Sequence, residues 1–117
     1  MSLSLEHAST GGSPVLSLTG ELDFGSTSVL RQAVDGLVRP ADPGLVLDLT
    51  SVNYVDSAGL HLLVQLADSL VAHRQQLRVV LLPNSPVRGV VHIAGLDGVL
   101  ALDVDVASAA LALRPPT

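Results

Sequence analysis

Residues 45–60 have the sequence LVLDLTSVNYVDSAGL and join a strongly apolar run to the start of a helix. The run Leu45–Leu49 is almost continuously apolar, which is typical of a central β-strand that is covered on both faces. We expect a connection from Thr50 to Asp56. Either Asp56 or Ser57 can cap the next helix, because their side chains accept hydrogen bonds from its first free N–H groups.

The helix after this junction has an apolar stripe at helical spacing. The stripe consists of Leu60, Leu63, Val64, Ala67, Leu70 and Val71, and Leu62 and Leu66 widen it to one side. A stripe of this width predicts that the helix contacts a neighbouring helix as well as the sheet. His61 lies in the opposite, polar stripe, where an exposed histidine is expected.

On the N-terminal side, the pattern predicts a hairpin followed by a helix. The apolar residues of 3–5 and 15–18 flank a turn at Gly11-Gly12-Ser13-Pro14, which favours two antiparallel strands. A loop is expected at Gly20–Gly25. From Ser26 the apolar residues recur every three or four positions, so we expect a helix that Ser26 or Thr27 caps and that ends before Pro40.

On the C-terminal side, strands and helices alternate. We expect a strand at Leu77–Leu82, a helix from Pro86 to Ala94 with Ser85 as its cap, a strand at Val99–Leu102 and a helix at Val106–Leu113. Gly95 fits the left-handed backbone conformation that commonly ends a helix. The order β-β-α-β-α-β-α-β-α predicts one α/β domain over residues 1–117, with helices packed on a small mixed β-sheet.

The composition excludes several classes of protein. The 117 residues are 48% hydrophobic and 2% aromatic, so the core is aliphatic, with Phe24 and Tyr54 as its only aromatic residues. The net charge is −5, and the chain contains no Lys. It lacks the basic and stacking surfaces that nucleic acids require and the basic segment that anionic membranes attract. The absence of Cys excludes disulfides and thiolate chemistry.

The location expected from the sequence is the cytoplasm. No apolar stretch of about 18 residues is present, so no membrane-spanning helix is expected. No Arg or Lys precedes Arg31, which is unlike a secretory signal.

Ser57 is the most informative candidate for a functional residue. A phosphate on its hydroxyl would add about −1.5 to −2 charge units. The partial positive charge of a helix N-terminus would tolerate that charge, whereas a docked partner would have to desolvate it beside Asp56. Phosphorylation could therefore end binding without unfolding the domain.

Three motifs resemble those of the STAS domain of bacterial anti-sigma factor antagonists. They are Gly20-Glu21-Leu22-Asp23, the segment from Asp48 to Leu60, and Ala94-Gly95-Leu96-Asp97. The resemblance extends from about Leu3 to Leu113, in the family's order and spacing. It implies a STAS fold and a protein that binds an anti-sigma factor, usually a serine kinase with its own ATP site, and so frees a sigma factor.

The resemblance also assigns roles to single residues. It implies phosphorylation of Ser57 by the anti-sigma factor and its reversal by a serine phosphatase. The implied partner-binding residues lie in the Asp23 loop and at the start of the second helix: Glu21, Asp23, Ser26, Asp56, Ser57, Ala58, Gly59 and His61. Many members carry Ser or Thr where this chain has Ala58. We expect a monomer, and we expect Asp23→Ala to weaken the complex without lowering thermal stability.

Other functions have weaker support in the sequence. A hydrolase using Ser57 and His61 would lack the Gly-x-Ser-x-Gly elbow. The four histidines have no metalloprotease spacing, and His92 is expected to pack half-buried in its helix. No phosphate-binding Gly-x-x-x-x-Gly-Lys loop is present. From these absences, neither a metal nor another cofactor is expected. The alternative that remains is a non-switching STAS subunit of a larger lipid-transport or stress-signalling assembly.

Overall fold

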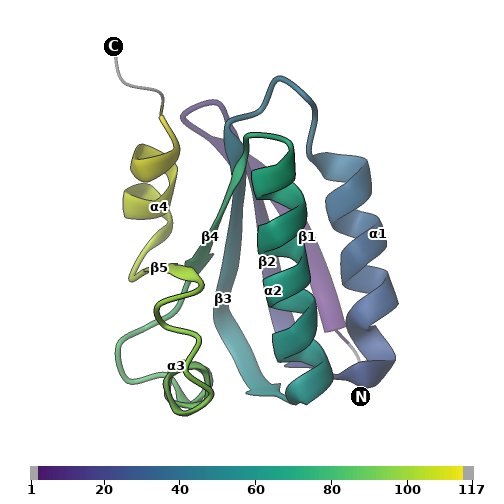
Figure 1. Cartoon of the computed structure of the whole chain (residues 1–117), viewed down its shortest axis with the longest axis vertical. Coiled ribbons are helices and arrows are strands. Elements are labelled where there is room, and N and C mark those ends of the chain that lie inside the picture. Colours follow the sequence, from purple (N-terminus) through teal and green to yellow (C-terminus); the bar gives the residue numbers. More distant parts are fainter. Residues whose placement is uncertain (1–2, 115–117) are drawn as a thin grey trace.

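The computed structural model describes residues 3–114 and contains one five-stranded sheet (Figure 1). The strands lie in chain order: β1 (Leu3–Thr10), β2 (Ser13–Leu22), β3 (Gly44–Val55), β4 (Gln76–Val80) and β5 (Ala101–Asp103). β1 and β2 are antiparallel, and all other neighbouring strands are parallel. The predicted mixed sheet and the order of elements are therefore confirmed.

The helices cover the two faces of the sheet unequally. They are α1 (Thr27–Leu37), α2 (Ser57–Ala72), α3 (Pro86–Ile93) and α4 (Val106–Leu113), and a short 3-10 helix, η1 (Phe24–Ser26), precedes α1. Buried residues of α1, α2 and α3 share one hydrophobic cluster with the sheet, whereas α4 belongs to a second cluster. α4 thus lies alone on the opposite face.

β3 is the central strand that its apolar run predicted. Leu45, Leu47 and Leu49 belong to the cluster with α1, α2 and α3, and Val46 belongs to the cluster with α4. All four side chains are fully buried. The strand therefore contributes to both halves of the core.

Most of the expected connection at Thr50–Asp56 is strand instead, and so is the first half of the expected loop at Gly20–Gly25. β3 continues to Val55 and β2 to Leu22, and these two residues face each other in the last pair of the ladder. Ser51 and Asn53 are exposed while Val52 and Val55 are buried, which is a half-buried strand pattern. The longer β3 therefore places Asp56 beside the end of β2.

Several smaller boundaries also differ from the prediction. The hairpin turn is confined to residues 11–12, because Ser13 and Pro14 already pair with β1. β4 runs over Gln76–Val80, and β5 begins only at Ala101. α1, α3 and α4 lie where the sequence placed them. The Ser85 hydroxyl accepts the N–H of Val87, and Gly95 has a φ of 75°.

The core-facing side of α2 is rotated relative to the predicted stripe. Its buried residues are Gly59, Leu62, Leu63, Leu66 and Leu70. Val71, which was assigned to the stripe, is 66% exposed. The contact between α1 and α2 is confirmed, and it explains why Leu62 and Leu66 are buried rather than peripheral.

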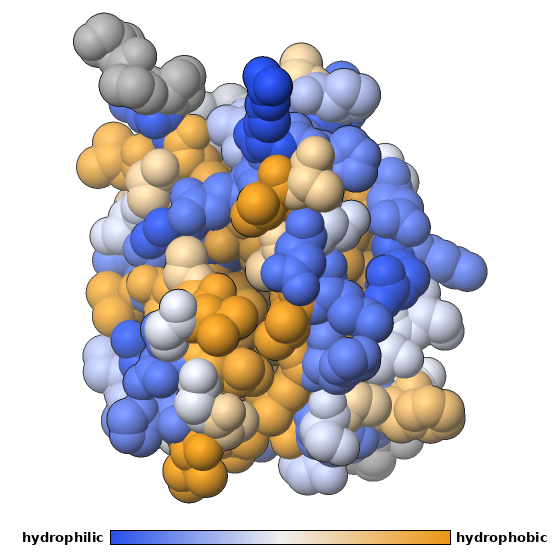
Figure 2. Space-filling view, viewed as in Figure 1, coloured by the Kyte–Doolittle hydropathy of each residue, from blue (hydrophilic) through white to orange (hydrophobic). Residues whose placement is uncertain are grey.

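The core contains only aliphatic side chains, but the two aromatic residues lie outside it. Phe24 is 80% exposed and Tyr54 is 50% exposed. Other apolar side chains gather on the surface between α2 and α3 (Figure 2). None of the described helices has the length and hydropathy that crossing a bilayer requires.

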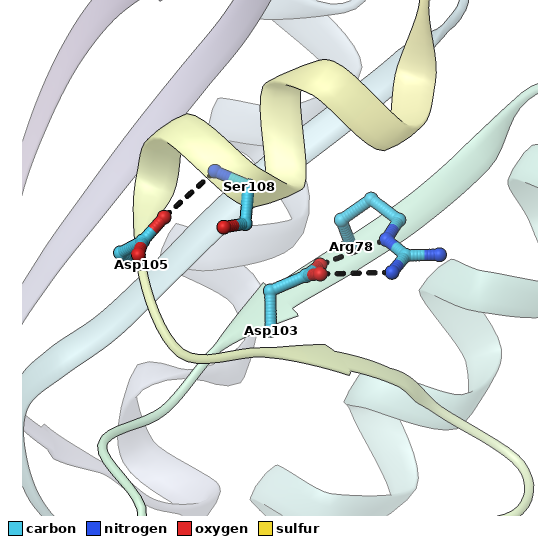
Figure 3. Close-up of polar contacts among 4 residues, drawn as sticks. All are labelled: Arg78, Asp103, Asp105 and Ser108. Atoms are coloured by element: carbon cyan, nitrogen blue, oxygen red, sulfur yellow. Dashed lines mark hydrogen bonds and ion pairs between the residues drawn. The ribbon is translucent and has the colours of Figure 1, made fainter.

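An ion pair joins β4 to β5 on the side of α4 (Figure 3). The guanidinium of Arg78 donates to both carboxylate oxygens of Asp103, at 2.8 and 2.9 Å, and both side chains are largely buried. This hydrogen bonding raises the pKa of Arg78. At the next turn, Asp105 caps α4 by accepting the N–H of Ser108 at 2.7 Å.

Asp103→Ala is expected to lower the free energy of unfolding by about 2 kcal/mol, because it leaves the Arg78 charge largely buried without a partner. The double variant Arg78→Met/Asp103→Ala should recover part of this loss, since no uncompensated charge remains. Urea denaturation of the two variants and the wild type measures both effects. A loss below about 0.5 kcal/mol, the level of an exposed pair, would contradict this role.

Candidate functional site

The Asp56 carboxylate fixes the start of α2 and connects it to η1. One oxygen, Oδ1, accepts the N–H of Gly59 at 2.9 Å, and the other, Oδ2, accepts the N–H of Phe24 at 3.1 Å. Asp56 is therefore the N-cap residue, while Ser57 is the first residue of the helix and is exposed. Ser57 is thus an exposed residue that directly follows the carboxylate linking α2 to η1.

Gly59 allows α2 to pack closely on the end of β2. A Cβ atom at this position would lie 2.5 Å from the carbonyl oxygen of Leu22 and 2.8 Å from Cγ2 of Val55. Gly59 is buried in this contact. Gly59 was expected at the partner surface, but its close approach is to the chain's own backbone at the end of β2.

Asp23 and Ser26 form a reciprocal capping box around η1. Asp23 Oδ1 accepts the N–H of Ser26 at 3.1 Å, and the N–H of Asp23 donates to the Ser26 hydroxyl at 3.0 Å. That hydroxyl also lies 3.1 Å from the carbonyl oxygen of Glu21. Ser26 is only 5% exposed, so it shapes the loop and is not available for the predicted partner contact.

Asp23→Ala is expected to lower the free energy of unfolding by about 1 kcal/mol, because it removes the acceptor of the Ser26 N–H. This expected loss differs from the one based on the sequence, in which Asp23→Ala leaves thermal stability unchanged. Asp23→Asn keeps an acceptor and should leave stability nearly unchanged while removing the charge. Urea denaturation of both variants tests the role, which equal stability of the Ala variant and the wild type would contradict.

A surface groove of about 280 Å³ separates η1 and the first turn of α1 from the first turns of α2. Ala58 lines it from α2, next to Ser57, and the exposed Phe24 lines it from η1. The sequence did not identify Phe24 as part of the site, since it was expected in the core. Its position directly after Asp23 was the only available signal.

His61 lines this groove and contacts Gln65 of the same helix, which in turn is hydrogen-bonded to Arg31 of α1. Its Nε2 lies 3.0 Å from the Gln65 Nε2, and the Arg31 guanidinium donates to the Gln65 Oε1. The Gln65 amide nitrogen can only donate, so His61 Nε2 is the acceptor of this hydrogen bond, an assignment made from these partners. His61 is exposed, as predicted.

All the predicted site residues lie at the end of the molecule where α1 and α2 begin, at the bottom of Figure 1. Glu21, Asp23, Asp56, Ser57, Ala58 and His61 are exposed or half-buried there. The surface around Ser57 therefore carries three carboxylates from two segments. Within residues 3–114, no three His, Cys, Asp or Glu residues are arranged to bind a metal ion.

His92 is not part of this site and is not packed half-buried, as the sequence had suggested. Its side chain is 76% exposed, and its Nδ1 lies 2.7 Å from the Asp97 carboxylate. This hydrogen bond lowers the pKa of Asp97.

Known proteins resemble this chain over most of its length. A family model described as "Mlab, STAS domain" matches residues 5–103. Anti-sigma-F factor antagonist RsfB of Mycobacterium tuberculosis is 30% identical over 97 residues, which cover 82% of this chain and 77% of that protein.

Solved structures share the fold. The crystal structure of an anti-sigma factor antagonist from Mycobacterium paratuberculosis has 29% identity and a TM-score of 0.83, covering 97% of this chain and 96% of that one. The structure of the Bacillus cell fate determinant SpoIIAA in its phosphorylated form has 24% identity and a TM-score of 0.62, covering 97% and 100%.

Proposed function

Because this chain belongs to the STAS domain family of bacterial anti-sigma factor antagonists, we propose that it binds an anti-sigma factor and that phosphorylation of Ser57 ends this binding. The single observation that carries the proposal is the exposure of Ser57 at the first position of α2, beside the capping Asp56. Its hydroxyl is accessible to a kinase while the backbone around it is fixed.

The electrostatics of this position support a switch that leaves the fold intact. The first N–H groups of α2 carry a partial positive charge, which offsets part of the charge of a phosphate on Ser57. At the bound interface that charge would lie beside Asp56, and both would lose contact with water. Removing a phosphate from water beside another carboxylate, without a cationic partner, costs several kcal/mol, so the phosphorylated chain dissociates.

The proposed contact surface is smaller than the sequence suggested. It comprises Glu21, Asp23, Asp56, Ser57, Ala58 and His61, with Phe24 added. Ser26 and Gly59 are left out of this surface because they are buried. They support it from within, Ser26 by hydrogen bonds in the loop and Gly59 by close packing on β2. Ala58 leaves the groove beside Ser57 without a second hydroxyl on α2, so Ser57 is the acceptor at this helix start.

The proposed partners follow from the family. The anti-sigma factor is a serine kinase that supplies ATP and transfers its γ-phosphoryl group to the Ser57 oxygen, and a serine phosphatase hydrolyses the phosphoserine. The chain itself acts as a binding module in the cytoplasm and not as an enzyme. SpoIIAA, a protein of the same fold, has been solved in a phosphorylated form, which is consistent with such a switch.

A mixing experiment tests the proposed release of a sigma factor. Purified chain is added to each complex of an anti-sigma factor with its sigma factor from the source organism, and free sigma factor is measured by size-exclusion chromatography. We expect release from one such complex, and loss of release after preincubation with that anti-sigma factor and ATP. No release from any complex would contradict the proposal.

The alternative is a non-switching STAS subunit of a larger assembly. Two observations favour it: the matching family model is described as "Mlab, STAS domain", and position 58 is Ala rather than Ser or Thr. Such a subunit would remain bound to its partners whatever the charge at position 57. The Ser57 variants described in the Discussion separate the two functions.

A further inference from the structure

A second groove, remote from Ser57, lies between β1 and α1. It has a volume of about 380 Å³, within the range of roughly 300–1,000 Å³ found for small-molecule sites. Leu5 and Leu16 line it from the sheet, and Ala33 and Leu37 line it from α1. Its lining residues on α1 lie toward the C-terminal end of that helix. The Ser57 site lies where α1 and α2 begin, at the bottom of Figure 1.

The groove exists because α1 does not fully cover β1. Leu3 and Leu5 point from β1 toward the core but are only half-buried. Gly36, on the groove side of α1, has no side chain, and no other atom lies within 4 Å of the position that its Cβ would occupy. An apolar channel is therefore left open between the edge strand and the helix.

The cationic side chain of Arg39 lies at one end of this channel. Arg39 lines the groove and two adjoining hollows, and His7 lies near it. The backbone of Arg39 is fixed, since its N–H donates to Asp42 Oδ2 at 2.7 Å and its carbonyl accepts Gln75 Nε2 at 2.8 Å. Among the described residues, no carboxylate pairs with its guanidinium, and the Asp42 carboxylate is already engaged by the backbone.

We propose that this groove binds a free medium-chain carboxylate. The alkyl chain lies between β1 and α1 against Leu5, Leu16 and Leu37, where it is removed from water. The carboxylate meets the Arg39 guanidinium, whose fork geometry matches its two oxygens. This site is independent of the proposed phosphorylation switch, because it shares no residue with the Ser57 surface.

Titration of the full chain with decanoate, followed by backbone NMR, tests the site. We expect saturable shifts centred on Leu5, Ala33 and Leu37. Arg39→Gln should weaken decanoate binding about tenfold or more and leave the binding of decan-1-ol unchanged, because only the carboxylate uses the guanidinium. Absence of saturable shifts with decanoate, or equal weakening for both ligands, would overturn the proposal.

Two glycine variants provide a matched test of location. Gly36→Leu fills the groove and is expected to abolish binding while the protein stays folded, since the position is open and helical. Gly89→Leu makes the same change at an open position of α3 and should leave binding intact. Decanoate binding that survives Gly36→Leu would overturn the assignment.

A second copy of the chain is the rival occupant of this surface. Sedimentation equilibrium of the wild type and of Gly36→Leu distinguishes it from a ligand. We expect the same monomeric mass for both proteins. A dimer of the wild type that Gly36→Leu dissociates would show that the groove is an interface between copies, and it would overturn the carboxylate site.

Discussion

Ser57→Asp is expected to lower the affinity of the chain for its anti-sigma factor at least about hundredfold, which corresponds to about 2.7 kcal/mol. The variant places a fixed negative charge beside Asp56 at the centre of the proposed contact surface, where binding removes it from water. The fold should be unaffected, because the helix start accommodates a negative charge and the position is exposed. Isothermal titration calorimetry with the purified anti-sigma factor measures the change.

Ser57→Ala is the matched control for this prediction. It removes the phosphorylation site without adding charge, so it should bind within about threefold of the wild type and should stay bound when ATP is added. Circular dichroism establishes that both variants are folded. Equal affinity of the Asp variant and the wild type would contradict the switch and would favour the non-switching STAS subunit.

Gly59→Ala is expected to cause the largest loss of stability of any single methyl addition at the site, about 2 kcal/mol net. The new Cβ would lie 2.5 Å from the Leu22 carbonyl oxygen, and a backbone oxygen cannot move aside as a flexible side chain can. The better helix propensity of Ala offsets only about 1 kcal/mol of the clash. Because the clash pushes α2 away from β2, binding to the anti-sigma factor should weaken as well.

Gly36→Ala is the control for this effect, since it makes the same change inside another helix. Its Cβ would meet no atom within 4 Å, so we expect a gain of about 0.5–1 kcal/mol from helix propensity alone. Thermal and urea denaturation of the two variants measure the difference. Comparable stability of Gly59→Ala and Gly36→Ala would show that the contact between α2 and β2 is not close-packed.

The sequence predicted the fold well where a single local pattern was sufficient. The apolar run Leu45–Leu49 predicted a strand buried on both faces, and α4 begins and ends at the predicted residues. The choice between Asp56 and Ser57 as the cap stayed open, because both residue types serve this purpose. The hydrogen bond from Phe24 N–H to Asp56 joins segments 32 residues apart, and no local pattern contains it.

The predictions that failed concern residues whose burial depends on distant parts of the chain. Residues 50–55 are mostly polar and resemble a loop, yet they form a strand because β2 pairs with them. Ser26 is a typical surface residue, but its hydroxyl satisfies backbone groups inside the loop. Gly59 was expected at the partner surface, and only the structure shows that it packs against the end of β2.

The most direct test of the central claim is the intact mass of the protein isolated from its own cells, followed by peptide mapping. We predict a population that carries one phosphoryl group, located on Ser57, in proportions that change with growth and stress. A population that is unmodified under all of these conditions would contradict the switch.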